Sequence, residues 1–168
     1  AMLQGHPDMN NIPGVDMSSG SLGQGVSCAV GMALSAKLDG GTFRVYTILG
    51  DGEIQEGQVW EAAMFAAAKK LDNLTVIVDN NNLQIDGTVE EVNSPYPIPE
   101  KFAAFGFHVI EIDGNDLDQI EAALAEAKAN LLSAGAAVEQ AKAQVDMSRS
   151  DYDRYQKLIQ HTPGAVSE

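Results

Sequence analysis

Residues 50–57 read GDGEIQEG and directly follow the apolar run RVYTIL of residues 44–49. The run predicts a buried strand over residues 43–49, and the periodicity after the glycines predicts a helix over residues 59–70. A second apolar run, LTVIVD at Leu74–Asp79, predicts another strand, and the polar stretch NNNLQIDG follows it. Two predicted strands therefore each lead into a loop rich in Gly, Asp and Asn.

The same alternation continues on both sides of these loops. Residues 21–38, SLGQGVSCAVGMALSAKL, predict a helix opened by Ser and Gly. After the second loop come the proline-rich stretch NSPYPIPE, to which the residues assign no chemistry, a short helix over 99–105 and a strand over 107–112. Alternating strands and helices predict an α/β fold, with a parallel sheet covered by helices on both faces.

Ligands bind such sheets at the carboxyl ends of the strands. Asp51 and Asn81 each follow a predicted strand, so their oxygen atoms are expected at one edge of the sheet. A carboxylate, an amide oxygen and a backbone carbonyl suit a hard cation such as Mg²⁺ that also holds a diphosphate. Gly50 and Gly52 are expected to let the backbone approach phosphates with positive φ. The alternative is a pair of ordinary strand-to-helix turns.

Composition limits the function classes. The formal net charge is −14 and basic residues are scattered, which argues against a nucleic-acid partner. No apolar run approaches the roughly 20 residues of a membrane span, so we expect no membrane association of the domain. Cys28 is the only cysteine, which excludes a disulfide, and it is expected to be a small buried residue.

The stretch from GDGEIQEG to DNNNLQIDG resembles the thiamine diphosphate motif of transketolases, which begins with GDG and ends near NN. The preceding GHPDMNNIPGVDMSSGSLGQGVSCAVGMALS resembles the segment before that motif in the same family. The resemblance covers about residues 3–127 and is closest to the N-terminal subunit of split bacterial transketolases. It implies a partial three-layer α/β/α fold with a mainly parallel sheet.

The resemblance also implies a cofactor site made of thiamine diphosphate and Mg²⁺, which Ca²⁺ or Mn²⁺ could replace. By this likeness Asp51, Asn81 and the main-chain carbonyl of Leu83 bind the metal. Gly52 lies against the diphosphate, and Ile85 packs beside the cofactor's rings. The expected ligands are therefore the residues that the sheet-edge rule singled out, together with their neighbours.

Four further residues match functional positions of the family. Gly20 and Leu22 match positions that contact the aminopyrimidine. Glu56 matches a glutamate of the proton-relay network at the subunit interface, and His6 matches a histidine that contacts substrate hydroxyls. The alternative for His6 is a terminal histidine without a role.

The implied reaction is two-carbon ketol transfer between sugar phosphates, as in the cytoplasmic pentose phosphate pathway. In the family, a separate pyrimidine-binding domain supplies a glutamate that activates the cofactor, and this sequence contains no such domain. We therefore expect a chain that begins partway into a larger domain, forms homo-oligomers, is inactive alone and needs a pyrimidine-domain partner subunit.

The sequence changes character after about residue 127. Small or apolar residues recur in steps of four and three, which is a heptad pattern, and predict a long coiled-coil-like helix over residues 128–168. The pattern consists of Ala134, Val138, Ala141, Val145, Ser148, Tyr152, Tyr155 and Ile159.

This tail resembles the α-helical hairpin of periplasmic adaptor proteins of efflux and secretion systems. The sequence thus divides into a part over 1–127 that resembles a cytoplasmic enzyme and a tail over 128–168 that resembles periplasmic proteins. A chimeric or mis-joined reading frame, with its junction near residues 127–131, and a natural fusion are both open. The second functional hypothesis is a structural protein that assembles through its tail without catalysis.

Overall fold

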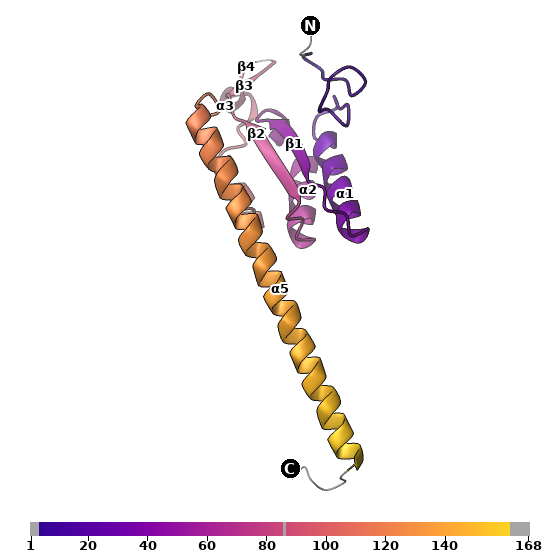
Figure 1. Cartoon of the computed structure of the whole chain (residues 1–168). Coiled ribbons are helices and arrows are strands. Elements are labelled where there is room, and N and C mark those ends of the chain that lie inside the picture. The colour runs from indigo at the N-terminus through magenta and orange to yellow at the C-terminus, as the bar shows by residue number, and fades with distance from the viewer. Residues whose placement is uncertain (1–3, 86, 162–168) are drawn as a thin grey trace. The chain divides into compact units, whose positions relative to one another are not determined.

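The computed structural model describes residues 4–85 and 87–161, except for the side chains of 131–138, 155 and 158–161. The chain divides into two compact units, Ala1–Glu111 and Ile112–Glu168. Figure 1 shows the elements in chain order: α1 Gln24–Leu38, β1 Val45–Gly50, the 3₁₀ turn η1 Glu53–Gln55, α2 Gly57–Ala68, β2 Leu74–Asp79, β3 Leu83–Gln84, β4 Gly87–Thr88, α3 Val89–Asn93, α4 Ile98–Phe105 and α5 Leu117–His161.

Strands β1 and β2 form a parallel pair whose register runs from Val45 opposite Leu74 to Gly50 opposite Asp79. Parallel neighbours need a crossover connection, and α2 provides it between them (Figure 1). Both strands therefore end at the same edge of the sheet, as the sequence predicts. The turns that follow β1 and β2 start side by side at that edge.

The core lies on one face of this pair. Val45, Leu49 and Leu74 point into it and are almost fully buried, and α1, α2 and α4 supply the rest of the buried cluster. Trp60 of α2 packs against Phe102 of α4 with tilted rings whose centroids lie 5.3 Å apart. Small side chains let the helices approach closely, and the alanines buried in this core are Ala29, Ala33, Ala62, Ala63 and Ala66.

The opposite face of the β1–β2 pair carries exposed side chains and is not covered by the described helices of the first unit. Tyr46 and Ile48 of β1 are 60% and 71% exposed, and Ile77 of β2 is 46% exposed. Because successive strand residues point to opposite faces, these side chains alternate with the buried ones. The prediction that helices cover both faces is therefore not met by the described residues of the first unit, where α1, α2 and α4 pack on one face.

The predicted strand over residues 107–112 is not formed. Phe107 and Val109 do pack against the core, so the apolar pattern correctly indicates which side chains are partly buried there. A strand also needs backbone hydrogen bonds to a neighbour, and the described sheet pairs only β1 with β2 and β3 with β4. This segment contributes side chains to the core without joining a ladder.

Two expectations about α1 also differ from the structure. The helix begins at Gln24 rather than at residue 21, because Gly23 adopts a left-handed conformation with φ of 80°. Cys28 is exposed, not buried. Val26, Ala29 and Val30 define the buried face of α1, and Cys28 is rotated about 200° from Val26, which places it on the other side.

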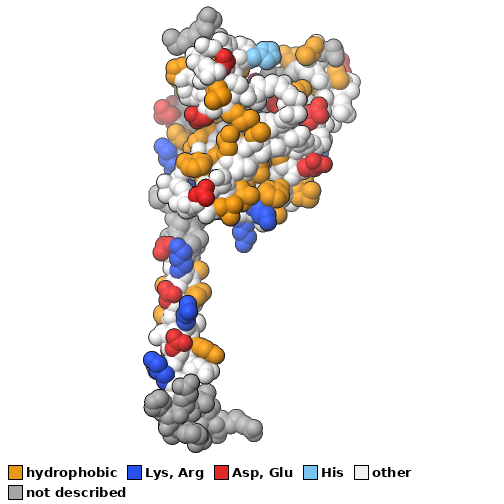
Figure 2. All heavy atoms as spheres, turned by 90° about the vertical axis from the view of Figure 1, so that its right-hand side faces the viewer, with side chains coloured by type: hydrophobic (Ala, Val, Ile, Leu, Met, Phe, Trp, Pro, Cys, Tyr) orange, Lys and Arg blue, Asp and Glu red, His pale blue; other side chains and the backbone are white. Residues whose placement is uncertain are grey.

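The second unit contains α5, a single helix over Leu117–His161. Asp116 caps its start, because its Oδ1 accepts the N–H groups of Asp118 and Gln119 at 3.0 and 3.2 Å. Acidic and basic side chains are interspersed over the described residues of 139–157 in α5 (Figure 2). A coiled coil needs a second helix, so the heptad pattern stays a prediction, and four of its side chains lie outside the described residues: Ala134, Val138, Tyr155 and Ile159.

We predict opposite outcomes for two neighbouring substitutions in β1. Leu49→Ala leaves a cavity in the core and should lower the free energy of unfolding by about 2–5 kcal/mol. Ile48→Ala removes an exposed side chain and should change it by less than about 1 kcal/mol. Urea unfolding followed by circular dichroism measures both. Equal losses would contradict the assignment of a buried and an open face.

Candidate functional site

Asp51 connects the loops that follow β1 and β2. Its N–H donates to the carbonyl of Asp79 at 3.1 Å, which extends the strand pairing by one residue. Its Oδ1 accepts the N–H of Gly52 at 2.9 Å and its Oδ2 accepts the N–H of Asn82 at 2.6 Å. The side chain is 1% exposed. A buried carboxylate requires such partners, and here they tie the two loops together.

The loop after β2 is shaped by its own amide side chains. Asn81 Oδ1 accepts the N–H of Leu83 at 2.9 Å, and Asn81 Nδ2 donates to Asp79 Oδ2 at 3.2 Å. Asn82 has a left-handed backbone with φ of 58°, which asparagine tolerates. Its carbonyl accepts the N–H of Val89, and its Oδ1 accepts the N–H of Glu90, both at 3.2 Å. The loop is thereby held in one conformation beside Asp51.

The oxygen atoms at this edge suit a hard cation. Each carboxylate oxygen has two lone pairs, so Asp51 keeps acceptor capacity after its two hydrogen bonds. Asn81 is exposed and offers an amide oxygen, and Leu83 offers a main-chain carbonyl two residues later. The described residues contain no cluster of three or more His, Cys, Asp or Glu side chains that could hold a metal. The donor set is mixed, which fits a cation that completes its shell with phosphate and water.

Gly52 is required by a close approach, not by its dihedral angle. Its φ is −64°, and neither Gly50 nor Gly52 is among the residues with positive φ, so that part of the prediction is wrong. A Cβ on Gly52 would lie 3.1 Å from Cβ of Gln84, closer than ordinary contacts. Only glycine lets β3 pack against this turn without displacement.

Gln84 is a site residue that the sequence analysis missed. Its Nε2 is buried and has no hydrogen-bond partner among the described residues. The amide side chain lies beside Gly52, where the diphosphate is expected. A buried N–H donor without an acceptor is costly, and an anionic ligand would satisfy it.

Glu53 is a second residue that sequence reasoning did not single out. Its Oε1 accepts the N–H of Gly23, at the start of α1, at 2.8 Å, and its Oε2 accepts the N–H of Gly50 at 3.3 Å. The first of these bonds spans 30 residues of sequence, so no local pattern indicated it. It brings the segment that contains Gly20 and Leu22 to the GDG turn.

The remaining predicted site residues are exposed. Leu22 and Leu83 are 57% and 65% exposed, and Ile85 is fully exposed at 101%. Leu22 adjoins Gly23 and Leu83 adjoins Asn82, whose backbone N–H groups are held by Glu53 and Asp51. Glu56 precedes α2 as its N-cap residue and is exposed. His6 is exposed in the segment before α1.

The proline-rich loop has a role at the same edge. The hydroxyl of Tyr96 donates to Asn80 Oδ1 at 2.7 Å, which anchors the loop after β2 from its far side. Burial raises the pKa of Tyr96 above its usual value, and the negative charges of Asp51 and Glu90 add to that rise. The Lys101 ammonium donates to the carbonyls of Pro95 and Tyr96 and so holds this loop in place.

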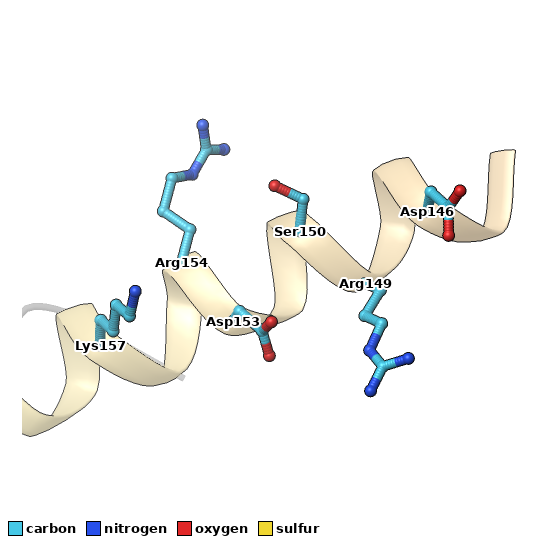
Figure 3. Close-up of a pocket in the computed structure, with 6 residues that line it drawn as sticks. All are labelled: Asp146, Arg149, Ser150, Asp153, Arg154 and Lys157. Atoms are coloured by element: carbon cyan, nitrogen blue, oxygen red, sulfur yellow. The ribbon is translucent and has the colours of Figure 1, made fainter. Parts of the chain in front are cut away.

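A surface hollow on α5 is not a second site. Its lining residues all leave one helix, and Figure 3 shows that Ser150 and Arg154 point to one side while Arg149 and Asp153 point to the other. Side chains that diverge in this way do not surround a ligand. Its lining residues are Asp146, Arg149, Ser150, Asp153, Arg154 and Lys157.

The geometry of the sheet edge agrees with a family match. Residues 1–133 match the family described as transketolase, thiamine diphosphate binding domain. The chain belongs to the transketolase family. The match covers the first unit, including both loops of the candidate site, and extends into the first turns of α5.

Characterised transketolases resemble the chain in sequence and in fold. It is 51% identical over 127 residues to a 6-deoxy-6-sulfo-D-fructose transketolase subunit of a Clostridium species, covering 76% of this chain and 46% of that protein. It is 44% identical over 120 residues to one subunit of the apulose-4-phosphate transketolase of Phocaeicola vulgatus, covering 71% and 42%. The crystal structure of Campylobacter jejuni transketolase superimposes with a TM-score of 0.67 at 39% identity, covering 74% and 20%.

The comparisons cover only part of each relative. The chain spans less than half the length of these transketolase relatives. The transketolase resemblance of the sequence is confirmed, whereas the adaptor-like resemblance of the tail is not, and the division at residue 127 stays a prediction. No helix in the described part of the chain has the length and hydropathy needed to cross a bilayer.

We predict that Tyr96→Phe reveals the pKa of the Tyr96 hydroxyl. In an alkaline absorbance titration, the curve of the wild type minus that of the variant should show one tyrosine with a pKa above the ordinary value of 10.0. The raised pKa means that the bond to Asn80 is intact below pH 10 and is lost as the pH rises through the folded-state pKa. A difference transition at or below 10.0 would contradict the burial and charges assigned to this group.

The same variant should also lower the free energy of unfolding at neutral pH by about 0.5–1.5 kcal/mol, the net value of one hydrogen bond. Tyr46→Phe is the matched control, because Tyr46 is 60% exposed on the open face of the sheet. It should change the stability by less than about 0.5 kcal/mol.

Proposed function

We propose that the chain binds thiamine diphosphate through Mg²⁺ and supplies half of an active site for two-carbon ketol transfer between sugar phosphates. The observation that supports this most directly is the buried Asp51 carboxylate, which joins the loops after β1 and β2 and leaves oxygen acceptors at the sheet edge. Family membership supports the cofactor class.

In this proposal the metal is held by Asp51, by the amide oxygen of Asn81 and by the main-chain carbonyl of Leu83. Mg²⁺ is the expected ion, and Ca²⁺ or Mn²⁺ could take its place because both accept oxygen ligands. The diphosphate lies against Gly52 and accepts a hydrogen bond from Gln84 Nε2, which has no acceptor in the described protein. Water and phosphate oxygens complete the metal shell.

The other predicted residues surround the organic part of the cofactor. Gly20 and Leu22 contact the aminopyrimidine, and Ile85 packs beside the rings. Glu56 belongs to a proton relay, and His6 binds substrate hydroxyls. The bound cofactor supplies a carbon nucleophile and an electron sink, while these residues orient it and exclude water.

We further propose that a partner subunit with a pyrimidine-binding domain completes the site and that the chain alone has no activity. Two relatives are named as transketolase subunits, and the chain spans less than half of each. The proposal that a partner subunit covers the site is supported by its exposed apolar side chains, which are those of Leu22, Leu83 and Ile85. The relatives are named for different sugars, so the proposal extends to sugar phosphates as a class and not to one pathway.

The tail does not support a second function in the same way. Val145 and Tyr152, two positions of the heptad pattern, are 65% and 62% exposed on α5. Their exposure is compatible with assembly through this helix, but surface apolar residues at this density are also ordinary. The adaptor-like and structural hypotheses therefore rest on the sequence pattern alone.

Thermal unfolding with and without Mg²⁺ and thiamine diphosphate tests the proposal. Ligand at about 100 times its Kd should stabilise the folded chain by about 2.7 kcal/mol and raise the melting temperature by about 5 °C or more. The rise should require both ligands. It should be lost in Asp51→Asn, and also in Asn81→Ala, which removes the amide oxygen together with its hydrogen bonds to Leu83 and Asp79.

Asp72→Asn is the matched control. It makes the same change beyond the opposite end of β2, where Asp72 pairs with Lys37 at 2.8 Å on the surface. Such pairs contribute little, so the ligand-induced rise should stay intact. If the melting temperature still rises in both site variants, the ligand binds elsewhere on the chain. If it does not rise in the wild type at saturating ligand, this chain does not bind the cofactor.

A further inference from the structure

The two segments expected to contact opposite ends of the cofactor belong to different parts of the chain. The GDG turn follows β1 and lies at the metal and diphosphate end. The segment with Gly20 and Leu22 precedes α1 and lies at the aminopyrimidine end in the proposed site. Among the hydrogen bonds of the described residues, the long-range contact that joins them is made by the side chain of Glu53.

Glu53 is well placed to hold both segments. It opens η1, directly after the GDG turn, and its half-buried carboxylate accepts the N–H of Gly23 at 2.8 Å and that of Gly50 at 3.3 Å. An ionised acceptor makes hydrogen bonds stronger than neutral ones. The Gly23 N–H also lies at the start of α1, where the helix dipole favours a negative charge.

The start of α1 packs tightly against the segment before α2. Gly23 has φ of 80°, and a Cβ there would lie 3.1 Å from Cβ of Glu56. A residue with a side chain at position 23 would be strained and would push α1 away from the turn before α2. The glycine at position 23 and the carboxylate of Glu53 therefore both allow the start of α1 to lie close to the segment between β1 and α2.

Peptide planarity makes this bond relevant to Leu22. In a trans peptide the N–H and the carbonyl point in opposite directions. Because Glu53 fixes the N–H of Gly23, it also fixes the direction of the Leu22 carbonyl, which faces away from the GDG turn. The orientation of the whole Leu22–Gly23 peptide is thus set by one side chain.

The metal side of the site has anchors of its own. Asp51 bonds to Asp79 through its backbone and to Asn82 through its carboxylate. Gly50 is paired with Asp79 in the sheet register. Loss of the Glu53 carboxylate should therefore release the Leu22 segment while the metal loop keeps its shape.

We propose that Glu53 is a positioning residue that fixes the Leu22–Gly23 peptide relative to the metal loop before the cofactor binds. The inference rests on the proposed function, since it assigns Glu53 to the geometry of the same site. It differs from a purely structural role because it affects one end of the ligand and not the other.

Binding of two ligands separates these roles. Isothermal titration of the full chain in Mg²⁺ gives Kd for inorganic diphosphate, which reaches only the metal loop, and for thiamine diphosphate, which reaches both segments. Glu53→Ala should raise Kd for thiamine diphosphate by about tenfold or more, because binding must then order the Leu22 segment that a hydrogen bond to a charged group holds in the wild type. It should change Kd for diphosphate by less than about twofold. Glu53→Gln keeps one acceptor oxygen and should restore part of the lost affinity.

Hydrogen exchange gives a readout that needs no cofactor. The Gly23 amide should exchange faster in ligand-free Glu53→Ala than in the wild type, because its acceptor is gone. Glu61→Ala is the matched control, since Glu61 is an exposed glutamate on α2. It should alter neither the exchange of Gly23 nor the two dissociation constants.

The outcomes distinguish this inference from the proposed function. If the wild type binds neither ligand, the proposed function fails and the inference fails with it. If the wild type binds both ligands but Glu53→Ala weakens them equally, Glu53 is structural and the positioning role is wrong. Unchanged exchange of Gly23 in Glu53→Ala, or unchanged affinity for thiamine diphosphate, would overturn it as well.

Discussion

The buried carboxylate of Asp51 is the constraint on which the rest of the site depends. Removing a charge from water is expensive unless hydrogen bonds replace the lost hydration. The N–H groups of Gly52 and Asn82 replace it here, one from the loop after β1 and one from the loop after β2. The hydrogen bonds that stabilise the sheet edge therefore also fix the orientation of the Asp51 carboxylate oxygens, which are the metal ligands of the proposed function.

This constraint explains several local features that look unrelated in the sequence. Asn82 adopts a left-handed backbone so that its N–H can reach Asp51 and its side chain can reach Glu90. Position 52 carries glycine because Gln84 approaches it too closely for a Cβ. Tyr96 then supports the loop from the other side through Asn80. Each feature keeps the second loop at the end of β1.

The sequence predicts the parts of this arrangement that depend on local pattern. The bounds of β2 are predicted correctly, and the parallel pairing of the two strands follows from their alternation with helices, so Asp51 and the loop after Asp79 are expected at one edge. The contacts of Glu53 and Tyr96 are not predictable in this way. They join residues 30 and 16 positions apart through side-chain directions that only the folded backbone defines. Residues 107–112 show the same limit, since their apolar pattern reports burial but not strand pairing.

Exposed apolar residues accompany the polar groups of the candidate site. Leu22 and Leu83 adjoin Gly23 and Asn82, whose backbone N–H groups are held by carboxylates, yet their side chains and that of Ile85 are exposed. A rigid backbone with exposed apolar side chains is already ordered, so covering it costs little conformational entropy. A ligand with apolar rings and a charged diphosphate matches such a surface, because the polar edge binds one part and the apolar residues cover the other. In the proposed function, the order imposed by Asp51 and Glu53 would prepare this surface for a cofactor and for a partner subunit that covers it.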